Sequence, residues 1–154
     1  MKRQLISLFL FLICILTACR PEATSSSPVT GTVNEEITLA PGQSASVSGT
    51  DLTVTFHSVV SDERCPSEIE CAASGPVTIS LSMQQGAGSP TDFTLQTFTD
   101  ENGRSPNVQF EGVTNQTEVG GYLIQILSVT PYPQNLTTNI EPSAYRIGLL
   151  VSNH

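Results

Sequence analysis

Two cysteines in the middle of the chain are the residues best suited to form a covalent link. Cys65 and Cys71 lie close together in the sequence, and in an oxidising compartment such a pair favours a disulfide. A loop this short limits the stabilisation to about 2–2.5 kcal/mol. A redox-active or metal-binding pair is the alternative, but the spacing is not Cys-x-x-Cys and no second ligand pair follows. We therefore predict a structural disulfide.

Four carboxylates flank or occupy this loop: Asp62, Glu63, Glu68 and Glu70. Calcium takes six to eight oxygen ligands, which a rigid acidic loop could supply in part. The Asp-x-Asx-x-Asx-Gly order of a dedicated calcium loop is missing, however. The favoured interpretation is a solvated acidic loop in which Arg64 pairs with a neighbouring carboxylate, and no metal or other cofactor is predicted.

A second candidate contact lies at Tyr132, between Pro131 and Pro133. Because proline fixes φ, this turn could present Tyr132 rigidly to a partner, or it could end a strand and pack a corner. The candidate residues for binding a partner are therefore Asp62, Glu63, Arg64, Glu68, Glu70 and Tyr132.

Residues for enzymatic catalysis are sparse. The chain has two histidines, His57 and His154, and a nucleophilic triad needs a base beside a serine or cysteine and a third group that orients it. No Gly-x-Ser-x-Gly elbow is present. We predict that the protein is not an enzyme. A hydrolase that uses paired carboxylates is a less favoured alternative, because their separation cannot be read from a sequence.

The N-terminus has the order of an export signal. Lys2 and Arg3 precede an apolar run, Leu5–Leu16, that is too short to span a bilayer, and small residues then lead to Cys19. The segment Leu16-Thr17-Ala18-Cys19 resembles a bacterial lipobox. This resemblance implies cleavage before Cys19 and a thioether bond from its sulfur to diacylglycerol. An uncleaved anchor helix or an ordinary signal peptide is the alternative.

Three segments follow from this interpretation: a signal peptide over residues 1–18, a lipidated cysteine and flexible linker over 19–34, and a folded domain over 35–154. The linker is small, polar and rich in proline and serine, so we expect no fixed structure in it. The protein would face the periplasm or the cell exterior, held to the membrane by lipid. The residue after Cys19 is Arg20 and not the aspartate that is linked to retention in the inner membrane. In a cell with two membranes, this favours the outer membrane.

The charge is strongly acidic, with 14 acidic and 6 basic residues. Lys2 and Arg3 leave with the signal peptide, so the mature net charge falls to about −10. Nucleic-acid binding depends on Lys and Arg contacts to phosphate. The composition therefore argues against a nucleic-acid partner.

In the domain the apolar residues alternate with a period of two, which predicts strands. Leu52, Val54 and Phe56 share one face of such a strand, and Tyr145, Ile147, Leu149 and Val151 share another. The predicted strands are Ile37–Leu39, Ala45–Ser48, Asp51–Val60, Val77–Leu81, Phe93–Phe98, Val108–Phe110, Tyr122–Val129 and Tyr145–Val151. Tyr122–Val129 is apolar on both faces, which favours a central position. About seven or eight strands at this spacing predict an all-β, antiparallel β-sandwich, either immunoglobulin-like or, as second choice, jelly-roll-like.

The loop at the cysteine pair resembles a group of uncharacterised bacterial lipoproteins that share an Asp-x-Arg-Cys-Pro-x4-Cys motif. Asp62, Arg64, Cys65, Pro66 and Cys71 carry the resemblance, with Gly75 beyond them. The chain departs from the motif at Ala73-Ser74, where an aromatic residue is expected. The resemblance implies a small β domain and no particular activity.

Together these observations predict a lipid-anchored cell-envelope lipoprotein with a non-enzymatic domain that binds an envelope protein, peptide or glycan through its loops. The alternative is a structural role in envelope assembly, in which a sheet edge pairs with another component.

Overall fold

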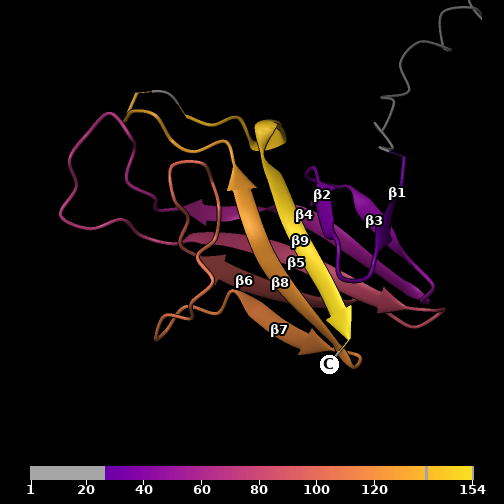
Figure 1. Ribbon diagram of the computed structural model, residues 1–154. Coiled ribbons are helices and arrows are strands. Elements are labelled where there is room, and N and C mark those ends of the chain that lie inside the picture. Colours follow the sequence, from indigo (N-terminus) through magenta and orange to yellow (C-terminus); the bar gives the residue numbers. More distant parts are fainter. Residues whose placement is uncertain (1–26, 138, 154) are drawn as a thin grey trace, which may run out of the picture.

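The computed structural model describes residues 27–137 and 139–153. Within these ranges the chain forms two β-sheets packed face to face (Figure 1). The strands are β1 (Val29–Thr32), β2 (Glu36–Leu39), β3 (Ser44–Ser48), β4 (Leu52–Asp62), β5 (Val77–Gln85), β6 (Thr91–Thr97), β7 (Gln116–Val119), β8 (Tyr122–Thr130) and β9 (Arg146–Asn153). A short 3-10 turn, Pro142–Ala144, precedes β9. The predicted signal peptide, Cys19 and residues 20–26 of the predicted linker lie outside the described residues.

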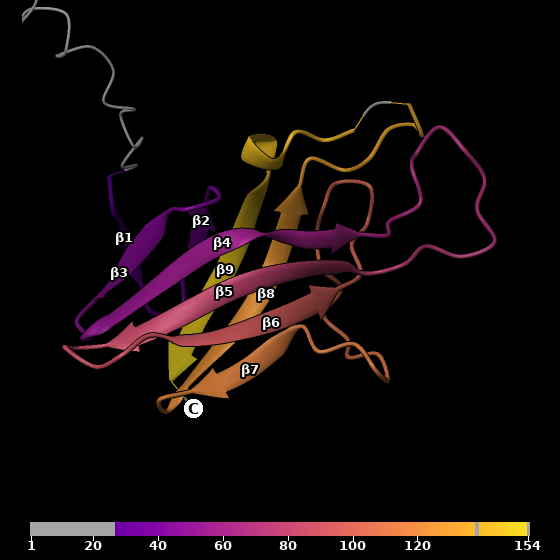
Figure 2. The same ribbon diagram turned by 180° about the vertical axis from the view of Figure 1, so that it is seen from behind.

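The larger sheet has five strands in the order β1-β3-β4-β5-β6 (Figure 2). Its inner face follows from the alternation in β4, where Leu52, Val54 and Phe56 are buried and the residues between them are half-buried. The same rule holds in β5 for Val77, Ile79 and Leu81. The two longest strands therefore supply most of this side of the core.

The smaller sheet has the order β2-β9-β8-β7. The strand β8 lies between β7 and β9, which confirms the central position predicted for it. In β9 the side chains of Ile147, Leu149 and Val151 are fully or almost fully buried against the other sheet. Fully burying a side chain of this size contributes about 1.5–3 kcal/mol to folding, so the facing rows hold the two sheets together.

The predicted β-sandwich is confirmed, with nine strands in the described ranges rather than seven or eight. The strand predicted at Val108–Phe110 is not formed; Phe110 makes a single bridge to Val113 and stacks edge-on against Phe98, with 4.9 Å between the ring centroids. The short strand β7 was not predicted, because its half-buried polar residues give no apolar alternation.

The boundary predicted between linker and domain is corrected by β1. This strand lies inside the segment predicted to be unstructured, and it pairs with β3 in parallel, Val29 opposite Ala45. One residue of β1, Gly31, is fully buried, so no apolar pattern marks the strand. The folded part of the chain therefore begins before Glu35, and one strand pair departs from the predicted antiparallel arrangement.

The strand order is a pair of meanders. β4, β5 and β6 follow one another in one sheet, and β7, β8 and β9 follow one another in the other. The immunoglobulin fold instead divides its strands as ABED and CFG, and the jelly roll consists of two Greek keys. The sandwich thus forms without either of the topologies considered from the sequence.

Three long connections leave the sandwich at the same end: residues 63–76, 98–115 and 131–145 (Figures 1 and 2). The strand β1 enters far from this end. Val29 lies level with Val54 through Ala45. The stretch of β5 that pairs with β4 from Val54 to Asp62 runs from Met83 to Val77 and covers roughly 20 Å at about 3.3 Å per residue. The folded N-terminus and the long connections therefore lie apart.

Candidate functional site

A buried arginine of the first connection contacts both of the others: Nη1 of Arg64 donates to Oγ1 of Thr99 at 3.3 Å, and Nη2 donates to the carbonyl oxygen of Pro131. Arg64 is 3% exposed, and its Nε and Nη2 donate to the two carboxylate oxygens of Asp62 at 2.8 and 2.6 Å. Its Nη1 donates to the carbonyl oxygen of Val129 at 2.8 Å, and Nη2 donates to that of Pro131 at 2.9 Å. The bidentate fork of guanidinium suits this arrangement. Arg64 thus fastens the end of β4 to the end of β8.

Two tyrosines complete the cluster, which we call the Arg64 brace: Asp62, Arg64, Tyr132 and Tyr145. The Tyr132 hydroxyl donates to the carbonyl oxygen of Cys65 at 2.7 Å, and its ring centroid lies 5.1 Å from Cζ of Arg64, within cation–π range. The Tyr145 hydroxyl donates to Oδ2 of Asp62 at 2.9 Å. The polar groups of these four residues therefore satisfy one another and the backbone around them.

The ionisation of the brace follows from these contacts. Burial alone would raise the pKa of Asp62, but the hydrogen bonds and charge of Arg64, with the hydrogen bond from Tyr145, outweigh it and lower that pKa. Burial and the neighbouring Asp62 carboxylate raise the pKa of Tyr145 to about 12. Near neutral pH the brace is an ion pair capped by a neutral phenol.

The disulfide predicted between Cys65 and Cys71 is present, with the two Cα atoms 6.0 Å apart. It closes the tip of the first connection, and two backbone hydrogen bonds then tie that tip to the third. The amide of Ser67 donates to the carbonyl oxygen of Pro133 at 3.0 Å, and the amide of Glu68 donates to that of Gln134 at 2.9 Å. The tip is thus held by the covalent link, the brace and these bonds.

A glycine allows the connection to close at its base. The amide of Gly75 donates to the carbonyl oxygen of Glu63 at 2.9 Å, and a Cβ at Gly75 would lie 2.6 Å from Cβ of Glu63. A side chain at position 75 would force the two strands of the loop base apart.

The residues predicted for partner binding fall into two groups. Asp62, Arg64 and Tyr132 come together in the brace, where their polar groups contact each other and the backbone. The other three, Glu63, Glu68 and Glu70, are exposed on the loop. In the part of the chain that the structure describes, no three His, Cys, Asp or Glu side chains gather in a way that could hold a metal ion.

A recess of about 440 Å³ lies between the first and third connections. Asp62, Glu63, Arg64 and Tyr145 line it from the side of the brace, and Pro66, Pro133, Leu136 and Ile140 give it an apolar lining. The side chain of Leu136 is 75% exposed at its edge. Leu136 was not predicted from the sequence, because a lone apolar residue in a polar loop carries no periodic signal.

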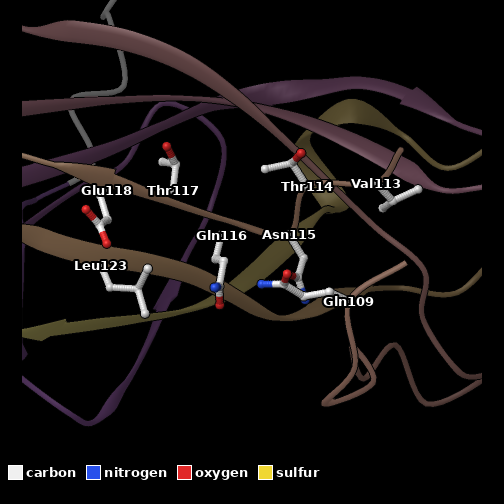
Figure 3. Close-up of a pocket in the computed structure, with 8 residues that line it drawn as sticks. All are labelled: Gln109, Val113, Thr114, Asn115, Gln116, Thr117, Glu118 and Leu123. Atoms are coloured by element: carbon white, nitrogen blue, oxygen red, sulfur yellow. The ribbon is translucent and has the colours of Figure 1, made fainter. Parts of the chain in front are cut away.

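A smaller recess of about 250 Å³ lies beside β7 (Figure 3). Its lining is largely polar: Gln109, Thr114, Asn115, Gln116, Thr117 and Glu118, with Val113 and Leu123. Asn115 is 5% exposed, and its Oδ1 has no hydrogen-bond partner among the described residues. Sequence analysis did not select this group, because a scatter of amides and hydroxyls matches no motif.

The histidine on β4 does not complete a catalytic triad. Nε2 of His57 lies 2.9 Å from Oγ of Ser82 and 3.7 Å from Oδ1 of Asp92. In a triad the serine and the acid contact opposite ring nitrogens, whereas here both lie at the same one. His154 lies outside the described residues.

The chain matches no family model, and no curated protein or solved structure was found to be similar to it. Within residues 27–137 and 139–153, no helix is long and apolar enough to cross a membrane.

Proposed function

We propose that the protein is a lipid-anchored lipoprotein of the cell envelope whose β-sandwich is a non-enzymatic binding domain. The anchor is supported by the order of charges, apolar run and small residues before Cys19. The Cys65–Cys71 disulfide fits an oxidising compartment outside the cytoplasm. The proposed partner is a protein or peptide of the envelope.

The observation that carries the binding role is the recess between the first and third connections. The Arg64 brace, the disulfide and the bond from Ser67 to Pro133 hold the part of its walls formed by Arg64, Pro66 and Pro133, so a partner would meet there a surface that loses little conformational entropy on binding. The exposed Leu136 offers an apolar contact in the same recess. The recess is far from β1, so it lies apart from the point where the linker joins the domain.

The anchor is tested with an alkyne-bearing fatty acid supplied to a bacterial host that expresses the full chain. The expected result is labelled, membrane-bound protein, and loss of both label and membrane retention in Cys19→Ala. Label that persists in Cys19→Ala would show that lipid is not attached at Cys19.

The binding surface is tested by placing a photo-crosslinking amino acid at position 136 in the lipidated protein and irradiating intact cells. A matched control carries the same amino acid at Ser89, an exposed residue in the β5–β6 connection at the other end of the sheet. We expect a discrete crosslinked product from position 136 and none from position 89. Equal crosslinking from both positions, or none from 136, would contradict binding at this recess.

An assembly role is a second candidate, favoured by the outer edge of β6. This strand ends the five-stranded sheet, and Thr91, Asp92 and Thr94 are exposed on it. An exposed edge can pair with a strand of another protein. A partner bound in this way should still be captured by the Cys65→Ser/Cys71→Ser variant, whereas a partner bound at the recess should be lost.

A further inference from the structure

The recess beside β7 lies where the segment before β7 joins the two sheets, at the outer strand β6 of one sheet and the inner strand β8 of the other. The carbonyl oxygen of Thr114 accepts from the amide of Gln96 in β6, and that of Asn115 accepts from the amide of Ile126 in β8, at 2.8 and 3.0 Å. The segment that leads into β7 is therefore pinned to both sheets. Its side chains are presented from a fixed backbone.

The surroundings of the Asn115 side chain are unusual for a residue with a purely structural role. It is 95% buried, yet its Oδ1 lacks a hydrogen-bond partner among the described residues. An unpaired buried polar atom destabilises a fold, and buried polar groups are paired as a rule. Asn115 lines the recess, and a ligand that displaces the atoms now covering Oδ1 and donates a hydrogen bond there would satisfy this group.

The rest of the lining narrows the chemistry of that ligand. Figure 3 shows the side chains of Gln109, Asn115 and Gln116 pointing toward the same region. Side-chain amides both donate and accept, so they match hydroxyl groups, which also do both. A hydroxyl would satisfy the Asn115 amide whichever way its oxygen and nitrogen are oriented. The apolar Leu123, which pairs with Glu118 in the register of β7 and β8, could contact the C–H face of a sugar ring.

The size of the recess sets a limit on the ligand. Its volume of about 250 Å³ lies just below the range of roughly 300–1,000 Å³ typical of sites for drug-sized molecules. One sugar residue, alone or as part of a longer chain, is the unit that fits. From these observations we propose that the recess lined by Gln109, Asn115 and Gln116 is a binding site for a neutral sugar residue of an envelope glycan.

The test uses the chain from residue 19 onward with Cys19→Ala, which keeps every strand of both sheets. The ¹⁵N-labelled protein is titrated with neutral hexoses, N-acetylhexosamines and their disaccharides, and the side-chain amide signals of Gln109, Asn115 and Gln116 are followed. We expect saturable shifts at these signals with at least one sugar. A deoxy analogue of that sugar should bind more weakly, because the side-chain amide that pairs with the missing hydroxyl is left without a partner.

The variant Asn115→Leu separates binding from folding. Removal of an unpaired buried amide should leave the thermal midpoint unchanged or raise it, while sugar affinity falls by about tenfold or more. Asn107→Leu, an exposed residue of the same connection, should keep full affinity. If Asn115→Leu does not fold, Gln116→Ala provides the same comparison from the neighbouring position.

Three outcomes would overturn the proposal: no saturable shift with any sugar tested, undiminished affinity in both variants, or shifts confined to residues elsewhere in the molecule. The first would mean that water alone satisfies Asn115. This site does not involve the disulfide loop, so Cys65→Ser/Cys71→Ser should retain sugar binding. Failure here and failure of binding at the larger recess can therefore be told apart.

Discussion

At the residue scale the Arg64 brace shows how a motif that looks like a binding loop in the sequence can have an internal role. The side chain of Arg64 is fully buried beside Asp62, and the next hydrogen bonds go to backbone 65 and 67 residues away in the chain. The sequence predicted an ion pair of Arg64 with a neighbour. It could not predict the partners in the third connection, because no local pattern encodes such contacts.

The first prediction concerns the loss of this arginine. Arg64→Ala leaves the Asp62 carboxylate buried without its partner, so the free energy of unfolding should fall by about 3–5 kcal/mol. Chemical denaturation monitored by circular dichroism measures the change. The control is Arg104→Ala, which breaks an exposed pair with Glu36 at 2.8 Å and should lower the stability far less, because solvent screens an exposed pair. A similar small loss for both variants would argue against the brace.

A second prediction concerns pH and rests on the two shifted groups of the brace. The pKa of Asp62 is lowered in the folded state, so its stabilisation is present above the pKa of the unfolded chain and is lost as the pH falls through the folded value. The pKa of Tyr145 is raised to about 12, so its contribution is present below about 10 and is lost as the pH rises toward 12.

Thermal midpoints measured across pH should fall at both extremes, which we call the acid and alkaline limbs of the stability curve. Asp62→Asn should reduce the fall in the acid limb, and Tyr145→Phe should reduce the fall in the alkaline limb. An alkaline limb that stays unchanged in Tyr145→Phe would mean that the phenol does not titrate as the structure implies.

At the element scale most strands could be predicted from apolar alternation, as in β4, β5 and β9. The exceptions are instructive. In β1 the buried position is a glycine, and β7 is largely polar and half-buried. Val108–Phe110 has apolar residues at both ends but forms a loop, in which the ring of Phe110 packs against Phe98. Alternation detects a strand only where its buried face is apolar, so edge strands held by backbone pairing escape it.

A third prediction tests a close approach between strands. Gly148 in β9 has no side chain, and a Cβ there would meet Glu36 and Ser128, which hydrogen-bond to each other. Gly148→Ala should therefore destabilise the smaller sheet by about 1–3 kcal/mol. In a Glu36→Ala background the penalty should shrink, because only the Ser128 hydroxyl, freed from its hydrogen bond to Glu36, then stands in the way. Thermal unfolding of the four proteins gives the coupling, and full additivity would contradict this account.

A fourth prediction concerns the disulfide loop. Cys65→Ser/Cys71→Ser should lower the free energy of unfolding by about 2 kcal/mol, since the closed loop is short. The sandwich itself should persist, because the brace still joins the end of β4 to the end of β8. Amide exchange should increase at Ser67 and Glu68 and stay slow in β5. Global loss of protection in β5 would mean that the loop supports the whole core.

At the scale of the whole molecule, the acidic sandwich presents its long connections at one end and receives its N-terminus far from them. The sequence predicted the β-sandwich and the disulfide, but it placed the start of the domain at Glu35. Pairing between β1 and β3 shows an earlier start. Strand order was also beyond the sequence, because several topologies satisfy the same alternation.

The fifth prediction tests that boundary. A chain that begins at Glu35 lacks β1 together with Val29 and Val33, which pack against the core. It should still fold, because β4–β6 and β7–β9 remain complete, but with a lower thermal midpoint than a chain that begins at Ser27. Equal midpoints would mean that the segment before Glu35 behaves as the linker predicted from the sequence.

The parallel pairing of β1 has a mechanical consequence if the N-terminus is anchored. A pull between the membrane and a partner bound at the long connections reaches the sandwich first through the β1–β3 ladder of four residue pairs. Since β1 is an outermost strand, it can detach while the two meanders stay closed. The freed segment from Val29 to Glu35 would lengthen the link by roughly 20 Å at about 3.3–3.6 Å per residue. Detachment of β1 would then extend the tether before the pull reaches the two meanders.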